Sequence, residues 1–204
     1  SQTDTEVLVH LYEEDGIAML SRLNGIFAFA LWDSKLQQLL VARDPIGVKP
    51  LYYTQPSKGV LFSSELKSLL ASSEVSREID PVAVHHHLAY LWAPAPRTML
   101  KSVQKLEPGH ALLINRGKVT RHWAYYDLPY DDTKLSGTKG DLINVIQHKT
   151  EEAVSRQMIS DVPIGAMLSG GLDSSAVVAM MRRAQPDQRT RCYTIGFEGE
   201  QDVE

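Results

Sequence analysis

The residues whose chemistry and spacing most clearly suit ligand binding lie in the stretch MLSGGLDSSAV, residues 167–177. Its centre joins an apolar, strand-like run to a helix-like run and consists of Ser169, Gly170, Gly171, Leu172, Asp173, Ser174 and Ser175. Unpaired N–H groups at the start of a helix attract anions, and glycines let the backbone approach phosphate closely. Hydroxyl groups add donors, whereas the Asp173 carboxylate would repel bare phosphate unless Mg²⁺ lay between them. The pattern favours a Mg²⁺–phosphate site over its alternative, a turn without a ligand.

The loop has no lysine of the kind that a Walker loop places on the β- and γ-phosphates of a nucleotide. SGGLDSS instead resembles the pyrophosphatase loop of the N-type ATP pyrophosphatases, which include asparagine, GMP, NAD and argininosuccinate synthetases. The resemblance implies that ATP is cleaved between its α- and β-phosphates, that the substrate is adenylylated, and that the loop holds the departing pyrophosphate.

Longer segments resemble the asparagine synthetase family in particular and keep its order along the chain. They are RLNGIFAFALWD (22–33), RDPIGVKPLYY (43–53), FSSELKSLL (62–70), APAPRTMLKSVQKLEPGHALLI (93–114) and SDVPIGAMLSGGLDSS (160–175). In that family a class II glutaminase domain hydrolyses glutamine and passes ammonia to a synthetase domain. The resemblance implies a ligase of the glutamine-hydrolysing asparagine synthase type that uses ATP, Mg²⁺, glutamine and aspartate or another carboxylate acceptor; it leaves a homodimer open.

The resemblance also assigns individual residues. Asp4 matches the aspartate that binds the glutamine α-amino group, and a carboxylate suits an ammonium partner; a helix N-cap is the alternative for this residue. Leu168, Ile195 and the adjacent Gly196 match positions that contact the ATP base or ribose, although Leu168 and Ile195 would otherwise pass for core residues. Asp173 would hold Mg²⁺ through pyrophosphate.

No catalytic residue is assigned, because a class II glutaminase needs an N-terminal cysteine and this sequence starts with Ser1. Cys192 lies in the second half and is expected to be a buried small apolar residue. The family's glutamine-binding Asn-Gly segment is also missing before Asp4. We therefore expect an internal, inactive fragment of a longer protein. Two alternatives stay open: a relative without the glutaminase nucleophile that makes another amide or ring, and a non-catalytic nucleotide-binding module.

The first half must supply the elements that position Asp4. The apolar spacing predicts an amphipathic helix over 5–20 that Gly16 interrupts, and a buried strand over 25–33. Further short strands follow, with a helix capped by Ser63 or Ser64, a helix that Asp80 and Pro81 start, and a hairpin that turns at Arg116-Gly117. Many short strands at close spacing indicate an antiparallel, sheet-based domain.

The second half must supply the loop. After a polar, turn-rich linker at 127–140 comes a helix with Leu142, Ile146, Thr150 and Ala153 along one side, and then the pattern strand, loop, helix, strand. We predict α+β followed by α/β. Residues 1–128 would be the C-terminal part of an N-terminal-nucleophile (class II glutaminase) β-sandwich domain. Residues 129–204 would start an adenine-nucleotide α-hydrolase-like parallel domain, the ATP pyrophosphatase part.

Composition excludes several other classes of protein. A formal charge of −4 gives no general basic field for nucleic acid or an anionic membrane. No apolar run approaches the roughly 18 residues of a membrane span. The single cysteine suits a reducing compartment, so we expect a cytoplasmic protein.

Other candidate sites are weaker. His85, His86 and His87 are consecutive and would point about 100° apart on a helix, so they are not expected to bind metal together. Arg43-Asp44 and Lys49-Pro50 are expected to stabilise a turn through an ion pair between strands. Glu65 is expected to be a first-turn helix carboxylate. The aromatic residues Tyr52, Tyr53, Trp123, Tyr125 and Tyr126 are expected to pack on strands.

Overall fold

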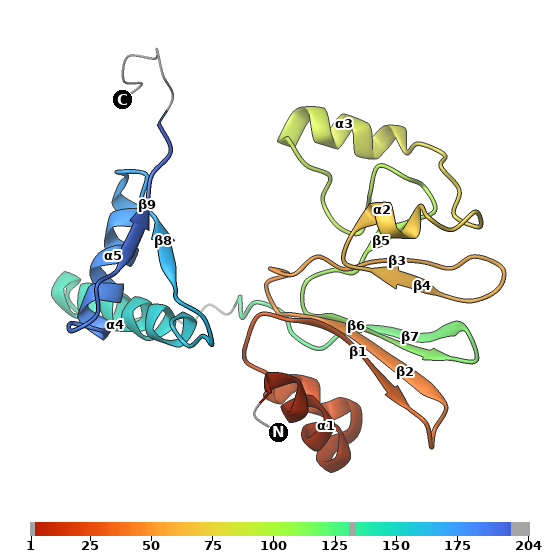
Figure 1. The fold of residues 1–204 in the computed structure, drawn as a ribbon, viewed down its shortest axis with the longest axis horizontal. Helices are drawn as coiled ribbons and strands as arrows, with labels where there is room; N and C mark the ends of the chain where they lie inside the picture. Colours follow the sequence, from red (N-terminus) through yellow and green to blue (C-terminus); the bar gives the residue numbers. More distant parts are fainter. Residues whose placement is uncertain (1–2, 131–133, 197–204) are drawn as a thin grey trace. The chain divides into compact units, whose positions relative to one another are not determined.

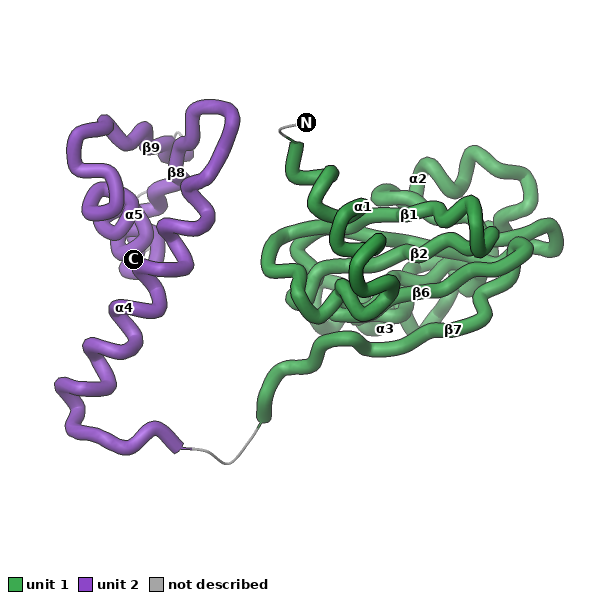
Figure 2. Tube along the Cα trace, turned by 90° about the horizontal axis from the view of Figure 1, so that it is seen from below, with its two compact units in different colours: residues 1–130 green, residues 131–204 purple. Residues whose placement is uncertain are grey.

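The structure is a computed structural model and describes residues 3–130 and 134–196. Contacts divide the chain into two compact units, residues 1–130 and 131–204, which Figure 2 shows in different colours. Among the described residues, no helix is both long and apolar enough to cross a membrane.

The first unit contains two antiparallel sheets (Figure 1). The larger sheet has the order β1-β2-β6-β7, formed by Ala28–Asp33, Gln38–Arg43, His110–Asn115 and Lys118–Ala124. The smaller sheet has the order β4-β3-β5, formed by Leu61–Ser63, Tyr52–Thr54 and Gln104–Lys105. The helical segments are α1 (Asp4–Asp15), the 3₁₀ segment η1 (Gly16–Arg22), α2 (Leu66–Leu69) and α3 (Pro81–Tyr90). The antiparallel, sheet-based prediction for this half is confirmed.

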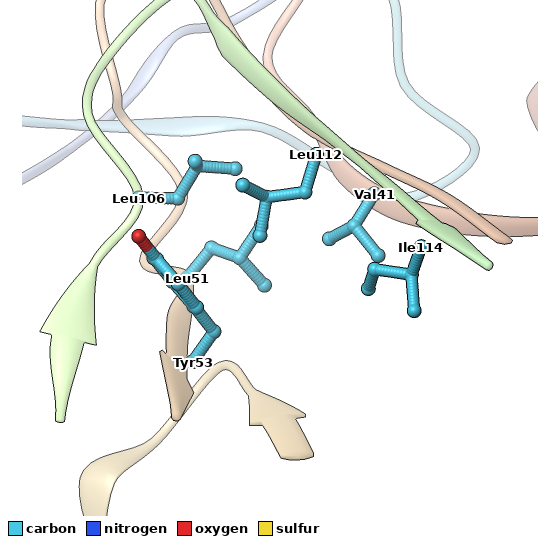
Figure 3. Packing of buried hydrophobic residues seen from close by; sticks show 6 residues of the cluster. All are labelled: Val41, Leu51, Tyr53, Leu106, Leu112 and Ile114. Carbon is cyan, nitrogen blue, oxygen red and sulfur yellow. The ribbon is translucent and has the colours of Figure 1, made fainter. Parts of the chain in front are cut away.

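The main core lies between the two sheets (Figure 3). It consists of Val41, Leu51, Tyr53, Leu106, Leu112 and Ile114. A second cluster packs Met19 and Leu20 of η1 on the other face of β2 and β6, at Leu40, Ala42 and Ala111. Successive side chains of a strand point to opposite faces, so β2 is buried on both sides. The unit is therefore layered as helix, sheet, sheet, with α2 and its cluster of Leu69, Val75, Leu100 and Val103 beyond the small sheet.

Local signals explain several boundaries. Gly16 has φ 57°, a left-handed value that glycine adopts at low cost, and the α-helix ends there and continues as 3₁₀. The predicted interruption at Gly16 is confirmed. The hairpin between β6 and β7 turns at Arg116 and Gly117, both with positive φ, as predicted. Asp80 caps α3 by accepting a 3.0 Å bond from the Val82 N–H, and Pro81 is the first helical residue.

Two predictions for the first unit are wrong, and a third is right only in part. The strand expected over 25–33 begins only at Ala28, and Trp32 is 55% exposed because β1 is the edge strand of its sheet. Glu65, rather than Ser63 or Ser64, is the N-cap residue of α2, so it precedes the first turn, and its side chain makes no capping bond. The helix expected over 5–20 is α-helical only to Asp15.

The expected ion pair at Arg43-Asp44 is also replaced by another arrangement. The Arg43 guanidinium donates to the carbonyl oxygens of Lys49, Leu106 and Gly47, while the Asp44 carboxylate accepts from backbone N–H groups of the same turn. Both side chains therefore bind backbone rather than each other. Burial is the main cause that lowers the pKa of Arg43 from its ordinary value, with the charge of Asp44 acting in the opposite direction.

The second unit has the order α4 (Lys139–Gln157), β8 (Gly165–Met167), α5 (Leu172–Ala184) and β9 (Arg191–Tyr193). Strands β8 and β9 pair in parallel, Gly165 with Arg191 through Met167 with Tyr193, so the strand–loop–helix–strand prediction is confirmed. Thr138 and Asp141 form a capping box at the start of α4. These elements place the loop after β8 and before α5.

Helix α4 uses the side predicted from its apolar spacing only in part. Leu142 and Thr150 are half-buried, but Ile146 is 64% exposed and Ala153 is exposed. Val154 is buried instead, and the Glu151 carboxylate pairs with Arg183 of α5 at 2.6 Å. The helix therefore meets α5 through the side that carries Glu151 and Val154. The prediction for α4 was based on the spacing of its apolar residues, but contact with α5 decides which of its residues are buried.

Candidate functional site

Leu168 fixes the entrance of the loop that follows β8. Its N–H donates to the Tyr193 carbonyl oxygen at 2.8 Å, and its carbonyl oxygen accepts from the Thr194 hydroxyl at 2.7 Å. Both groups come from β9 or the residue after it, so the loop begins at the carboxyl end of the parallel pair. In open parallel α/β sheets this end is where ligands bind.

Two glycines shape the turn into α5. Gly170 has φ 85°, and a Cβ placed there would meet nothing within 4 Å, so the conformation, rather than crowding, requires glycine. Gly171 is the N-cap residue of α5, and no side chain caps that end among the described residues. The first turn of α5 thus offers N–H groups and the positive end of a 13-residue helix dipole.

The serine hydroxyls of Ser169 and Ser174 are engaged inside the loop. Their oxygens lie 3.0 Å apart, and the Ser174 hydroxyl also donates to the Gly171 carbonyl oxygen at 3.2 Å. The Ser169 N–H donates to Ser174 Oγ at 3.3 Å. These bonds hold the loop in shape, so the two hydroxyls must rotate to donate to an anion, whereas Ser175 uses its backbone N–H on Gly171.

The carboxylate of Asp173 is exposed in the first turn of α5. No group of three or more His, Cys, Asp or Glu that could hold a metal ion occurs in the described part of the chain. One carboxylate alone is a poor Mg²⁺ site, but Mg²⁺ commonly combines one or two carboxylates with phosphate oxygens and water. The residues present therefore fit a metal that arrives with a polyphosphate.

Leu168 is half-buried, whereas the other two apolar residues at the loop are solvent-exposed. Leu172 is 86% exposed and Ile195 70%, and both lie near the carboxyl ends of β8 and β9. Gly196 is exposed with open space around its Cα. Cys192, expected to be buried, is exposed, because no further element covers that side of β9 among the described residues.

Asp4 lies in the first unit, at a pocket of about 720 Å³. It is the first residue of α1, after the N-cap residue Thr3, so the N-cap alternative for Asp4 is wrong. Its Oδ1 accepts from the Thr5 hydroxyl at 3.3 Å. The pocket is lined by Asp4, Thr5, Val7, Leu8, Leu23, Asn24, Gly25, Ile26, Phe27, Ala28, Phe29, Lys49, Pro50 and Ser64.

The pocket is also lined by the polar residues Lys49, Asn24 and Ser64, and the sequence did not predict that they share a pocket with Asp4. They come from three segments up to 60 residues away from Asp4 in the chain. Each segment resembles a family by itself, but nothing in the spacing of the three predicts that they lie together. The pocket combines one carboxylate, one lysine and apolar walls, which suits a small charged molecule with an apolar stem.

The remaining candidates do not form sites. His85, His86 and His87 lie along α3, and they form no metal-binding group among the residues described. Tyr53 is a core residue, and Tyr125 donates to the Arg43 carbonyl oxygen at 2.6 Å. Trp123 stacks against Arg121, with the guanidinium carbon 4.4 Å from its ring centre.

Comparison with known proteins assigns both units. Residues 1–126 match the family described as glutamine amidotransferase domain, and residues 145–204 match asparagine synthase. The chain is 39% identical to a putative glutamine-hydrolysing asparagine synthetase of Methanocaldococcus jannaschii, over 98% of this chain and 39% of that protein. It is 37% identical to asparagine synthetase 3 of Bacillus subtilis, over 87% of this chain and 29% of that protein.

The chain therefore spans roughly a third of the length of the curated relatives that it matches. Among solved structures, the glutamine phosphoribosylpyrophosphate amidotransferase of B. subtilis aligns with a TM-score of 0.40 and 19% identity, over 95% of this chain and 39% of that one.

Proposed function

This chain belongs to the glutamine amidotransferase domain family, with the two-part make-up of its asparagine synthetase relatives, and from this premise we propose that it takes part in ATP-dependent amide synthesis. Glutamine is hydrolysed to glutamate and ammonia. A carboxylate substrate attacks the α-phosphorus of ATP, pyrophosphate leaves, and ammonia displaces AMP from the acyl-adenylate to give the amide. Aspartate is the acceptor that the names of the relatives suggest.

The proposed binding of ATP rests on the amino end of α5, which no described side chain caps and which follows Gly170, a residue with φ 85°. Backbone N–H groups there would bind the departing pyrophosphate, assisted by the hydroxyls of Ser169, Ser174 and Ser175. Asp173 would hold Mg²⁺, which would supply positive charge against the departing pyrophosphate. The exposed side chain of Ile195 and the backbone of Leu168 and Gly196 supply a surface for the nucleoside.

The Asp4 pocket supports the glutamine half of the proposal. A carboxylate in a pocket with apolar walls can bind the α-ammonium group of an amino acid while the walls contact its methylene groups. Asp4 is therefore proposed as a glutamine-binding residue. No catalytic nucleophile is assigned among residues 1–204, since the single cysteine lies in β9 of the other unit.

The layering supports the finer fold assignment. Residues 3–128 form two stacked antiparallel sheets with helices outside them. We propose that residues 1–128 are part of a class II glutaminase domain of the N-terminal-nucleophile type. The parallel β8–α5–β9 unit is proposed to start an adenine-nucleotide α-hydrolase-like domain over residues 129–204. The division of contacts at residue 130 is compatible with this boundary.

Label transfer tests the proposed function in the full-length gene product. Glutamine carrying ¹⁵N in its amide is supplied with ATP, Mg²⁺ and aspartate, and the products are analysed for labelled asparagine, AMP and pyrophosphate. Labelled asparagine with AMP supports the proposal. Formation of ADP and phosphate would contradict the assignment of the loop, and an unlabelled amide would contradict the use of glutamine.

A further inference from the structure

Asp44 is, with Asp80, one of two charged residues that are buried among the described residues of unit 1. It is 1% exposed, and its carboxylate accepts three backbone N–H groups, from Ile46 at 3.2 Å and Val48 at 2.9 Å through Oδ1 and from Lys49 at 3.0 Å through Oδ2. A buried carboxylate is costly unless hydrogen bonds satisfy it. Here the bonds converge on a turn of the chain after β2.

The main chain of Asp44 makes further connections. Its N–H donates to the Phe27 carbonyl oxygen at 2.8 Å, and its carbonyl oxygen accepts from Gly47 at 3.0 Å and from Gly109 at 2.9 Å. Asp44 thus joins the segment before β1, its own turn and the segment before β6. A single residue that joins three segments fixes their separation.

Two of the tied segments line the Asp4 pocket. Phe27 belongs to the pocket wall, and so do Lys49 and Pro50. Lys49 is held at both ends, because its N–H binds Asp44 and its carbonyl oxygen accepts from Arg43 Nε at 2.7 Å. The proline that follows restricts the backbone further.

We propose that Asp44 is a positioning residue for the amino-acid pocket that contains Asp4: it holds the Phe27 wall and the Lys49-Pro50 wall at the separation that fits the ligand. Asp44 does not line the pocket itself, so it acts through the residues it holds. This inference depends on the proposed function, because the ligand is taken to be glutamine.

Asp44→Asn in the full-length gene product tests the inference. The amide NH₂ of asparagine can no longer accept the Lys49 N–H, so we expect the KM for glutamine hydrolysis to rise about five- to thirtyfold, with kcat changed less than threefold. Amide formation with ammonium chloride in place of glutamine is expected to keep the wild-type rate, because it bypasses the pocket.

Asp80→Asn is the matched control. Asp80 is likewise buried, in the same unit, and also accepts a backbone N–H, but it caps α3 and does not line the pocket. We expect Asp80→Asn to lower thermal stability without changing the KM for glutamine. An equal rise of KM in Asp80→Asn would show that loss of any buried carboxylate in this unit has the same effect, and it would overturn the inference.

Gly47→Ala disturbs the same turn without changing Asp44. Gly47 has φ 71°, and an added Cβ would lie 2.8 Å from Pro108 Cγ and 3.0 Å from Arg43 Cζ. We expect a rise in KM like that of Asp44→Asn. Wild-type KM in both variants would refute the positioning role. A wild-type protein that neither binds nor hydrolyses glutamine would instead refute the proposed function, and the inference with it.

Discussion

The Thr194 hydroxyl donates a 2.7 Å hydrogen bond to the carbonyl oxygen of Leu168 and so joins the residue before the loop to the residue after β9. The bond fixes the point at which the chain leaves the parallel strand pair. It also fixes the orientation of the Leu168 carbonyl group where the chain enters the glycine turn.

Loss of this bond is expected to weaken nucleotide binding. Thr194→Val keeps the shape of the side chain and removes the donor, and we expect the KM for ATP in ATP–pyrophosphate exchange to rise about two- to tenfold. Thr150→Val is the matched control, because Thr150 donates to Ile146 within α4 and lies outside the loop. An unchanged KM for ATP in Thr194→Val would show that the loop does not need this support.

Asp173→Ala tests the metal role. We expect ATP–pyrophosphate exchange to fall by at least 100-fold, because the carboxylate that would hold Mg²⁺ on the pyrophosphate is lost. Glutamine hydrolysis, measured as glutamate release, should keep its wild-type rate. Asp187→Ala, another acidic residue of the second unit, serves as control, and exchange that persists in Asp173→Ala would remove the metal assignment.

Asp4→Asn tests the glutamine pocket. The side chain keeps its size but loses the charge that would bind an ammonium group, so we expect the KM for glutamine to rise about tenfold or more. ATP–pyrophosphate exchange should stay unchanged. Asp15→Asn, at the far end of the same helix, should leave the KM for glutamine as it is; a normal KM in Asp4→Asn would contradict the role of Asp4.

Gly109 should be the most sensitive glycine of the first unit. It has φ 66°, and a Cβ there would lie 2.6 Å from the Tyr126 carbonyl oxygen. Gly109→Ala is expected to lower the free energy of unfolding by about 2–4 kcal/mol, from left-handed strain and the clash. Gly25→Ala, where nothing lies within 4 Å, should cost far less in the same urea titration; equal costs would contradict the explanation.

The carboxyl group of Asp80 is expected to make the stability of the folded protein depend on pH. Burial raises the pKa of its carboxyl, but bonds from Arg97 at 2.6 Å and from backbone N–H groups outweigh burial and leave it lower than usual. A carboxyl group whose pKa is lower in the folded than in the unfolded state stabilises the folded state. This stabilisation is fully present above the unfolded-state pKa, about 3.9, and is lost as pH falls through the folded-state pKa.

The urea midpoint of the wild type should therefore fall as pH drops from about 5 toward 3, and Asp80→Asn should reduce that fall. Asp127→Asn, at an exposed position of the same unit, should follow the wild type. Parallel curves for the wild type and Asp80→Asn would show that Asp80 contributes nothing to acid sensitivity.

Local chemistry made several features predictable. Gly16 ends the first α-helix, Asp80 and Pro81 start α3, and Arg116-Gly117 turns the β6–β7 hairpin, because each depends on the backbone preferences of one or two neighbouring residues. The place of the loop between β8 and α5 was predictable for the same reason, since it depends on residues that are consecutive in the chain.

Features that depend on distant contacts were not predictable in this way. The amphipathic pattern of α4 predicted the covered side only in part, because contact with α5 through Glu151 and Arg183 decides its orientation. Cys192 was expected inside the protein but is exposed on β9. Ser63 and Ser64 were plausible caps, but the chain enters α2 one residue later.

The sequence by itself predicted the antiparallel and parallel halves and the place of the glycine-rich loop between a strand and a helix. Its resemblance to a family suggested the roles that we propose for that loop and for Asp4. Only the tertiary structure decided what surrounds Asp4 and what Asp44 does. Phe27 and Lys49 line the pocket from different segments of the chain. Asp44 binds the Phe27 carbonyl oxygen through its main-chain N–H and the Lys49 N–H through its carboxylate, and the order of residues in the sequence does not predict either partner. A residue's identity limits the bonds it can form, but the packing of the two sheets decides which groups come close enough to form them.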